Sequence, residues 1–340
     1  MEHLALLGLA DSGHTALFAA LTGQDVAAAS DKVLGMVAIP DERLQRLAEM
    51  SESQNVVPAT LQLAYLPGLS TEAGKGLGSR LLGSVRDADA IMLVVRADEG
   101  HDPTRELAAL EEELILADLG TVEARVYKQK RAAKGDKSLA AEIAALEHAE
   151  SVLSDGTPIY RADLPEAERA ALAPAFLLTN KPALVVVNIG IDQLEDADAL
   201  AAQFGDDALA VCIEIEGDPD VVAAQGAERA ELLADLGVPE SVVPRLARAA
   251  LHLLGRRTFL TTGDKESRAW TFRAGAHAPE CAGVIHTDLQ RGFIRAEVID
   301  WEELLAVGSW AKAKEAGTLR VEGKDYVMAD GDVVEIRFNV

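Results

Sequence analysis

A glycine-rich turn near the N-terminus constrains the fold more than any other feature of this sequence. The short apolar run Leu4-Ala5-Leu6-Leu7 precedes Gly8, as expected of a strand that is buried on both faces. Small and polar residues follow Gly8, and residues 15–21 then form an amphipathic segment. A strand, a glycine turn and a helix in this order predict the opening of an α/β domain.

Further apolar runs have the length and composition of buried strands. They are residues 61–65, 90–95, 184–187 and 208–213. Several of them are separated by stretches long enough for the crossover connections that parallel strands require. The sequence therefore predicts an α/β fold with a mostly parallel sheet.

A different pattern lies between the predicted strands at 90–95 and 184–187. Leucine and isoleucine recur at spacings of three and four, at Leu107, Leu110, Leu114, Leu139, Ile143, Leu146 and Leu153. Charged residues fill the other positions, and Gly135-Asp136 interrupts the pattern. We expect two long helices, an antiparallel hairpin inserted at residues 104–179. The charge runs at 111–113 and 128–131 predict solvated helix faces, with a docking surface as the alternative.

Strand patterns return beyond about residue 265. Residues 269–272, 292–298, 325–328 and 333–338 predict strands, and residues 301–305 predict a short helix. This predicts a small α+β module at residues 265–340. The sheet domain then comprises residues 1–103 and 180–264.

Composition limits the class of partner. The chain has 56 acidic and 32 basic side chains, a formal net charge of −24, which argues against a whole-surface nucleic-acid binder and against a DNA partner. A local basic patch remains compatible with that charge. Cys212 and Cys281 form no disulfide framework and have no partner at metal-ligand spacing. With neither a signal peptide nor an apolar run long enough for a membrane span, we expect a cytoplasmic protein.

The turn after Gly8 matches most of a phosphate-binding loop. In the pattern G-x-x-x-x-G-K-[ST], backbone N–H groups cradle phosphates at the start of a helix. His14 stands where the lysine belongs, and it is shorter and mostly uncharged at neutral pH. We consider His14 either as a phosphate contact or as an ordinary helix-start residue. The candidate nucleotide-binding residues here are Gly8, Ala10, Asp11, Ser12, Gly13, His14 and Thr15, and Thr15 is also the candidate ligand for Mg²⁺.

Two further nucleotide motifs are incomplete. The strand at 61–65 is followed by Gly68, but Tyr65 stands where a D-x-x-G motif needs its carboxylate. Asn188, a further candidate nucleotide contact, fits the first position of N-K-x-D, whereas Ile191 occupies the position that reads guanine. Residues for acid–base or nucleophilic catalysis do not occur at informative spacing, so we predict no catalytic residue.

The chain resembles the YchF (Obg-like) ATPase family of translation-factor-related P-loop proteins over essentially its whole length. The resemblance rests on Pro40-Asp41-Glu42-Arg43-Leu44, Gly76-Leu77-Gly78, residues 85–91, Lys265-Glu266-Ser267-Arg268-Ala269-Trp270-Thr271, Ile285-His286-Thr287-Asp288, residues 292–298, residues 322–326 and Arg337-Phe338-Asn339-Val340. It implies a P-loop NTPase domain, an inserted helical hairpin and a C-terminal TGS-type, ubiquitin-like domain. Members of that family bind ATP, often in preference to GTP, hydrolyse it slowly and associate with ribosomes.

The departures from that family lie in its nucleotide motifs. Where the family has G-x-x-N-V-G-K-S-T, this chain has His14 in place of the lysine. Tyr65 replaces the aspartate of the family's D-x-A-G, and Ile191 replaces the glutamate of its N-x-x-E. The switch segment is shortened to residues 27–32. We expect weakened binding of ATP or GTP with Mg²⁺.

Three functions follow from this pattern. The first is a ribosome- or translation-associated binding protein, a pseudoenzyme with weak or absent hydrolysis. The alternatives are a slow, ATP-preferring or GTP hydrolase, and a regulator that binds nucleotide without hydrolysing it. The predicted partner is the ribosome or ribosomal RNA, facing Arg291, Arg295, Lys312 and Lys314 if these do not simply form a solvated surface.

Overall fold

The computed structural model describes residues 3–68, 79–133, 137–224, 226–238 and 240–339. The predicted break at Gly135-Asp136 and the family segment Gly76-Leu77-Gly78 lie outside the described residues. The chain divides into two compact units, residues 1–36 with 62–246 and residues 37–61 with 247–340. Each unit is described by itself.

The secondary structure alternates in the first half and is strand-rich at the C-terminus. The strands are β1 (His3–Gly8), β2 (Val33–Ile39), β3 (Asn55–Val57), β4 (Ala59–Tyr65), β5 (Ala90–Arg96), β6 (Ala183–Asn188), β7 (Leu209–Val211), β8 (Arg256–Thr261), β9 (Glu266–Arg273), β10 (Phe293–Asp300), β11 (Arg320–Glu322) and β12 (Asp332–Phe338). The α-helices are α1 (His14–Thr22), α2 (Glu42–Met50), α3 (Ser79–Asp87), α4 (Pro103–Ala132), α5 (Ala140–Ser154), α6 (Glu166–Leu172), α7 (Ala197–Ala201), α8 (Ile213–Glu216), α9 (Pro219–Ala223), α10 (Gly226–Asp235), α11 (Val243–Leu253), α12 (Ala278–Ile285), α13 (Thr287–Arg291), α14 (Trp301–Val307) and α15 (Trp310–Ala316).

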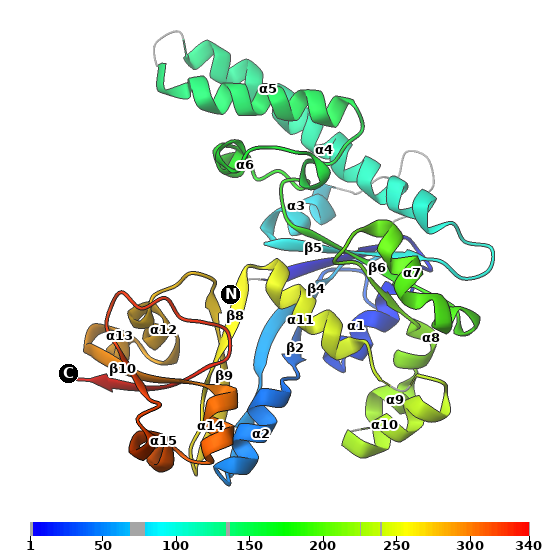
Figure 1. Cartoon of the computed structure of the whole chain (residues 1–340). Helices are drawn as coiled ribbons and strands as arrows, with labels where there is room; N and C mark the ends of the chain where they lie inside the picture. The colour runs from blue at the N-terminus through cyan, green and yellow to red at the C-terminus, as the bar shows by residue number, and fades with distance from the viewer. Residues whose placement is uncertain (1–2, 69–78, 134–136, 225, 239, 340) are drawn as a thin grey trace. The chain divides into compact units, whose positions relative to one another are not determined.

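The first sheet is the predicted parallel sheet. Its order is β2-β4-β1-β5-β6-β7, and β1 runs parallel to both β4 and β5 (Figure 1). Strands β5, β6 and β7 are also parallel to one another. All five predicted strands of this domain are present, and the apolar residues of β1 and β5 are buried in its core. The α/β prediction is confirmed.

The edge strand β2 does not follow from the sequence pattern. Alternate side chains of this strand are exposed and buried from Leu34 to Ile39, because an edge strand is covered less completely than the central ones. Gly35 interrupts the apolar run of residues 33–39. The run therefore does not stand out from the shortened switch segment at residues 27–32.

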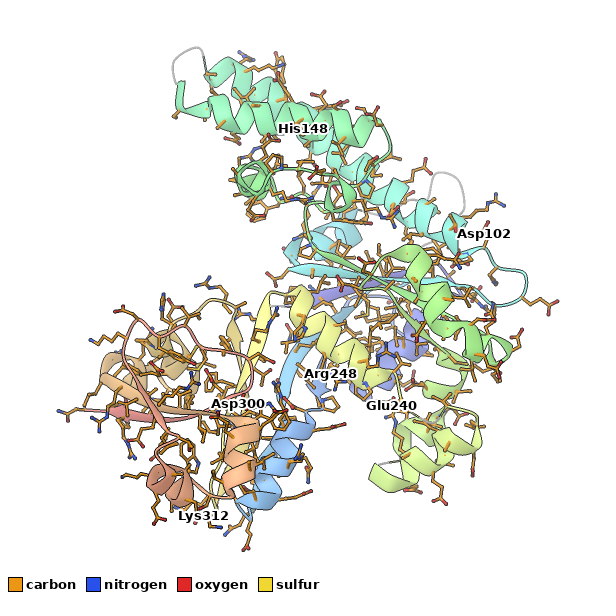
Figure 2. All side chains as sticks on the ribbon, viewed as in Figure 1. Asp102, His148, Glu240, Arg248, Asp300 and Lys312 are labelled. Carbon is orange, nitrogen blue, oxygen red and sulfur yellow. The ribbon has the colours of Figure 1, made fainter. Side chains whose placement is uncertain are left out.

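Helices α4 and α5 form the predicted antiparallel hairpin. Val122 and Val126 on α4 are buried with Ala145, Leu146 and Ala149 on α5. Asp102 caps α4 by accepting hydrogen bonds from the backbone N–H groups of residues 104 and 105, and Figure 2 labels it at the start of that helix. None of the described helices is both long and apolar enough to cross a membrane.

A buried carboxylate fixes α4 to the chain that returns to β6. Asp118 is fully buried and accepts hydrogen bonds from the backbone N–H groups of Leu178, at 2.8 Å, and Thr179, at 2.7 Å. The Thr179 hydroxyl donates a third bond at 2.7 Å. Burial raises the pKa of Asp118, and these three bonds oppose that shift.

The second unit contains the C-terminal sheet, in the order β11-β10-β12-β8-β9-β3. Predicted strands at 269–272, 292–298 and 333–338 are present as β9, β10 and β12. The prediction of a strand at 325–328 is wrong. Only Val327 forms a bridge, to His277: the Tyr326 carbonyl accepts from the Ala278 N–H and the Met328 N–H donates to the Ala276 carbonyl. The pairing goes no further because α12 begins at Ala278.

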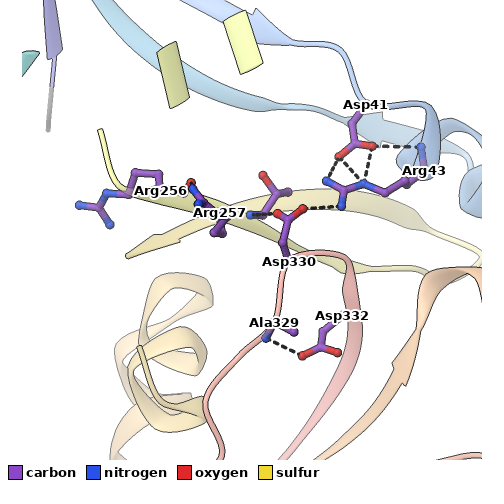
Figure 3. Close-up of polar contacts among 8 residues, drawn as sticks. Asp41, Arg43, Arg256, Arg257, Ala329, Asp330 and Asp332 are labelled. Atoms are coloured by element: carbon purple, nitrogen blue, oxygen red, sulfur yellow. Dashed lines mark hydrogen bonds and ion pairs between the residues drawn. The ribbon is translucent and has the colours of Figure 1, made fainter. Parts of the chain in front are cut away.

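Residues 37–61 are built into this C-terminal unit although they come early in the sequence. Strand β3 pairs in parallel with β9. Arg43 donates to Asp41 at 2.7 Å and to Asp330 at 2.8 Å, and Asp330 also accepts the Thr258 N–H (Figure 3). The predicted domain boundaries at 103, 179 and 264 stay a prediction.

Candidate functional site

The backbone of the glycine-rich turn has the form of a phosphate-binding loop. Strand β1 ends at Gly8, and α1 begins at His14 after Gly13, which has a φ of 89°. A Cβ atom on Gly13 would lie 2.6 Å from Asn188 Nδ2, so the position requires glycine for space as well as for its left-handed backbone. The loop therefore leads directly into the N-terminus of α1, where backbone N–H groups favour binding of an anion.

The interior of this loop is filled by two of its own side chains. Ser12 Oγ and His14 Nδ1 share a hydrogen bond of 3.0 Å, and the two residues are only 1% and 3% exposed. Gly8 makes room for them, because a Cβ there would lie 2.2 Å from Ser12 Oγ. His14 is thus turned inward and its ring does not extend toward solvent.

His14 provides no positive charge at neutral pH. Its ring stacks on Tyr65, with centroids 5.4 Å apart and planes at 10°. Burial lowers the pKa of His14 to about 4, although the backbone of Leu66 partly opposes the shift. Its Nε2 atom is buried and forms no hydrogen bond with the described residues. The position that holds the cation of a phosphate loop is neutral here.

The Tyr65 side chain contacts the Thr15 hydroxyl, the group that binds a metal ion in the phosphate-loop motif. Thr15 Oγ1 lies 3.2 Å from Tyr65 Oη, within hydrogen-bond distance, and the Tyr65 ring also contacts Phe18. Among the described residues, no three His, Cys, Asp or Glu side chains are grouped as a metal site. That Thr15 binds Mg²⁺ stays a prediction, and the structure shows its hydroxyl beside that of Tyr65.

Asn188 is brought to the loop, but both ends of its amide bond to backbone. Its Nδ2 donates to the Ser12 carbonyl at 3.1 Å, and its Oδ1 accepts the Ile213 N–H at 3.2 Å. Asn188 thus joins the end of β6 to the loop and to α8. Ile191, at the predicted base-reading position, is 48% exposed.

A cavity of about 790 Å³ opens beside the loop and α1. Most of its wall is small and apolar, and the wall also includes Asp11, Asp25 and Arg96. Arg96 donates to the Asp11 carbonyl at 3.2 Å and is paired with Asp98 at 2.7 Å. The cavity has the size of a site for a small molecule, while its carboxylates disfavour a polyanion.

Sequence reasoning missed Arg96 although its position carried a signal. It directly follows the apolar run of β5, at the carboxyl edge of the parallel sheet where α/β proteins bind ligands. The structure places the predicted residues Gly8 to Thr15 and Asn188 together around one loop. That they bind a nucleotide stays a prediction.

Comparisons with known proteins agree over nearly the whole chain. The family model YchF-GTPase_C, described as a protein of unknown function (DUF933), matches residues 257–339. The ribosome-binding ATPase YchF of Bacillus subtilis (strain 168) is 37% identical, with 98% of each chain covered. Obg-like ATPase 1 of Oryza sativa subsp. japonica is 32% identical, over 99% of this chain and 92% of the relative. The solved structure of the Schizosaccharomyces pombe YchF GTPase has a TM-score of 0.86 and 27% identity, and covers 99% of this chain and 97% of its own.

Proposed function

Because the chain belongs to the YchF family of Obg-like ATPases, we propose that it is a ribosome-associated binding protein whose phosphate loop supports weak or no hydrolysis. The names of the bacterial relatives support the ribosome as partner, and this partner implies a cytoplasmic protein. One observation carries the loss of hydrolysis: the hydrogen-bonded and stacked group of Ser12, His14 and Tyr65 inside the loop.

The physical reason is the distribution of charge. Phosphoryl transfer is accelerated almost entirely by positioning and by cations that meet the charge of the transferred group. His14 is buried and neutral, and Arg96 is already paired with Asp98. The remaining contribution of the loop is its backbone N–H groups, which favour binding of an anion without supplying the missing charge.

A slow hydrolase is the second candidate, and the names of the relatives support it more directly than they support a pseudoenzyme. Those names print ATPase for the bacterial and rice proteins and GTPase for the yeast structure. The loop backbone and the adjacent cavity suit this reading, since both are present. Nucleotide binding without turnover is the intermediate case.

A titration with turnover separates these candidates. Purified protein is titrated with ATP, GTP and ADP, with and without Mg²⁺, by calorimetry, and phosphate release is then followed. We expect weak binding in the wild type, and His14→Lys should raise ATP affinity by about 10- to 100-fold, since hydrogen bonds to charged groups contribute about 1.5–3 kcal/mol. Wild-type turnover that Thr15→Ala abolishes would contradict the proposal. Thr104→Ala, an exposed threonine of α4, is the matched control.

Ribosome association needs its own measurement. Wild-type protein should co-sediment with purified ribosomes in the absence of added nucleotide, because the proposed role does not depend on hydrolysis. Co-sedimentation that requires ATP would favour the slow hydrolase. Failure to co-sediment under all nucleotide conditions would contradict the ribosomal partner.

A further inference from the structure

Charge is divided sharply along α4. From residue 103 to 123 the helix carries one cation, Arg105, and six carboxylates, whereas residues 124–132 carry four cations and no carboxylate. The cations are Arg125, Lys128, Lys130 and Arg131. In a chain with a formal net charge of −24, this end of α4 is a local exception.

Two of these cations have partners on α5. Arg125 Nε donates to Glu142 Oε1 at 2.9 Å, and Gln129 donates to the same oxygen at 3.0 Å. Lys130 Nζ lies 2.7 Å from Glu147 Oε1. These contacts hold the two helices of the hairpin together, and they account for one side of α4.

Tyr127, Lys128 and Arg131 lie on another side, which we call the outer face of α4. Positions 127, 128 and 131 are neighbours on a helical surface, since residues three and four apart share a face. Tyr127 is 66% exposed and outside the hairpin core, and the Arg131 guanidinium lies 5.6 Å from its ring centroid. Lys128 forms no ion pair or hydrogen bond with any described residue.

Helix stability explains only part of this arrangement. Cations in the last turn interact favourably with the negative end of the helix dipole, which accounts for Lys130 and Arg131. The helix dipole gives no reason for an exposed tyrosine beside these cations. An exposed ring flanked by cations is the combination with which proteins bind single-stranded nucleic acid, by stacking on bases and contacting phosphates.

We propose that the outer face of α4 binds single-stranded RNA, with Tyr127 stacking on an unpaired base while Lys128 and Arg131 contact the flanking phosphates. Charge complementarity favours this partner, because four cations without a carboxylate at this end of α4 attract a polyanion that the net charge of the chain, −24, otherwise repels. The ribosomal source of that RNA rests on the proposed function. The contact itself does not.

The test uses the full chain and a fluorescent, unstructured single-stranded oligoribonucleotide, followed by anisotropy over a range of salt concentrations. Replacing both cations, Lys128→Gln with Arg131→Gln, removes two phosphate contacts and should reduce the salt slope by about 1.4. Tyr127→Ala should weaken binding by at least about tenfold, and Tyr127→Phe should restore it, because the ring stacks without its hydroxyl. The matched control, Lys265→Gln with Lys324→Gln, removes the same charge from two exposed positions of the C-terminal unit and should bind as the wild type does.

Each other outcome overturns the proposal. These are a wild type that does not bind the oligoribonucleotide at low salt, outer-face variants that bind it as the wild type does, and a control variant that loses it. Outer-face variants that lose binding to anionic phospholipid vesicles but keep their binding to RNA also overturn it. Far-ultraviolet circular dichroism confirms that each variant is folded. Ribosome co-sedimentation is scored separately, so its failure contradicts the proposed function and not the RNA contact.

Discussion

The phosphate loop and the outer face of α4 use their polar side chains in opposite ways. In the loop, Ser12 bonds to His14 and Thr15 to Tyr65, so polar atoms that would meet a ligand already meet one another. On the outer face, Tyr127 and Lys128 are exposed, and Tyr127 is bonded to Arg131 of the same face, at 3.5 Å. The loop has the backbone conformation of a phosphate-binding site, whereas the outer face has exposed side chains of the kind that bind nucleic acid.

Burial explains the difference. A buried polar group that loses its partner costs about 1–3 kcal/mol, so the buried side chains of the loop are expected to pair with one another. An exposed lysine needs no partner, since water solvates it. Stability should therefore depend strongly on side chains of the loop and hardly at all on those of the hairpin surface.

The largest expected effect is the pH dependence of stability due to His14. Its pKa is about 4 in the fold against 6.5 for the ordinary group, so the unfolded chain takes up a proton below pH 6.5 that the folded chain refuses. Protonation of the unfolded chain therefore lowers the free energy of unfolding, by about 2–3 kcal/mol between pH 7 and pH 4.5. Above pH 6.5 both states are neutral and this effect is absent. Urea unfolding at several pH values measures it.

His14→Asn should remove this part of the pH dependence, because asparagine does not titrate. His148→Asn, on α5, should leave it in place and serves as the control. If His14→Asn and the wild type lose stability in parallel, His14 is not the buried neutral group described here, and the comparison between the two surfaces fails.

Asn188→Ala should cost about 2 kcal/mol, since it leaves the buried Ile213 N–H without its acceptor and frees the Ser12 carbonyl. The free energy of unfolding from urea titration checks it, with the exposed Asn55 as the matched alanine control. A cost no larger than that of Asn55→Ala would show that the loop does not depend on this amide.

Tyr65→Phe should cost about 1 kcal/mol, because it removes one hydrogen bond to Thr15 and keeps the stacked ring. Tyr127→Phe is the control from the outer face, and its effect on thermal stability should be close to zero. Equal effects at the two tyrosines would erase the distinction between a buried and an exposed hydroxyl.

The smallest effect belongs to the hairpin surface. Lys130→Gln breaks the ion pair with Glu147, and should leave the midpoint of thermal unfolding nearly unchanged because the two side chains are 55% and 47% exposed. Thermal unfolding in low and high salt measures it. A cost as large as that of Tyr65→Phe would mean that an exposed ion pair stabilises the fold as much as the loop's hydrogen bond does, which contradicts the comparison.

Much of the fold was predictable because it depends on local patterns. The strand before Gly8, the helix after Gly13 and the leucine spacing of α4 each follow from residues close in sequence. The substitutions at His14 and Tyr65 were visible in the same way. Their stacking was not, since it joins positions 51 residues apart through a parallel strand pairing.

The roles of individual site residues were harder to predict than their positions. The motif leaves His14 as either a phosphate contact or an ordinary helix-start residue, and the structure shows it buried against Ser12. Asn188 was predicted from a motif to contact a nucleotide. The structure shows its amide bonded to two backbone groups, and the nucleotide contact stays a prediction. A motif fixes the residue type at a position, while the partner is decided by neighbours from distant strands.

The pairing of β3 with β9 also has a consequence for the time course of synthesis. About 200 residues separate the two strands. At translation rates of about 5–20 residues per second, β3 and α2 wait on the order of 10–40 s before β9 has been made. During that interval the apolar face of α2 and the open edge of β3 have no final partner, so they expose the nascent chain to aggregation until residues 266–273 have been made.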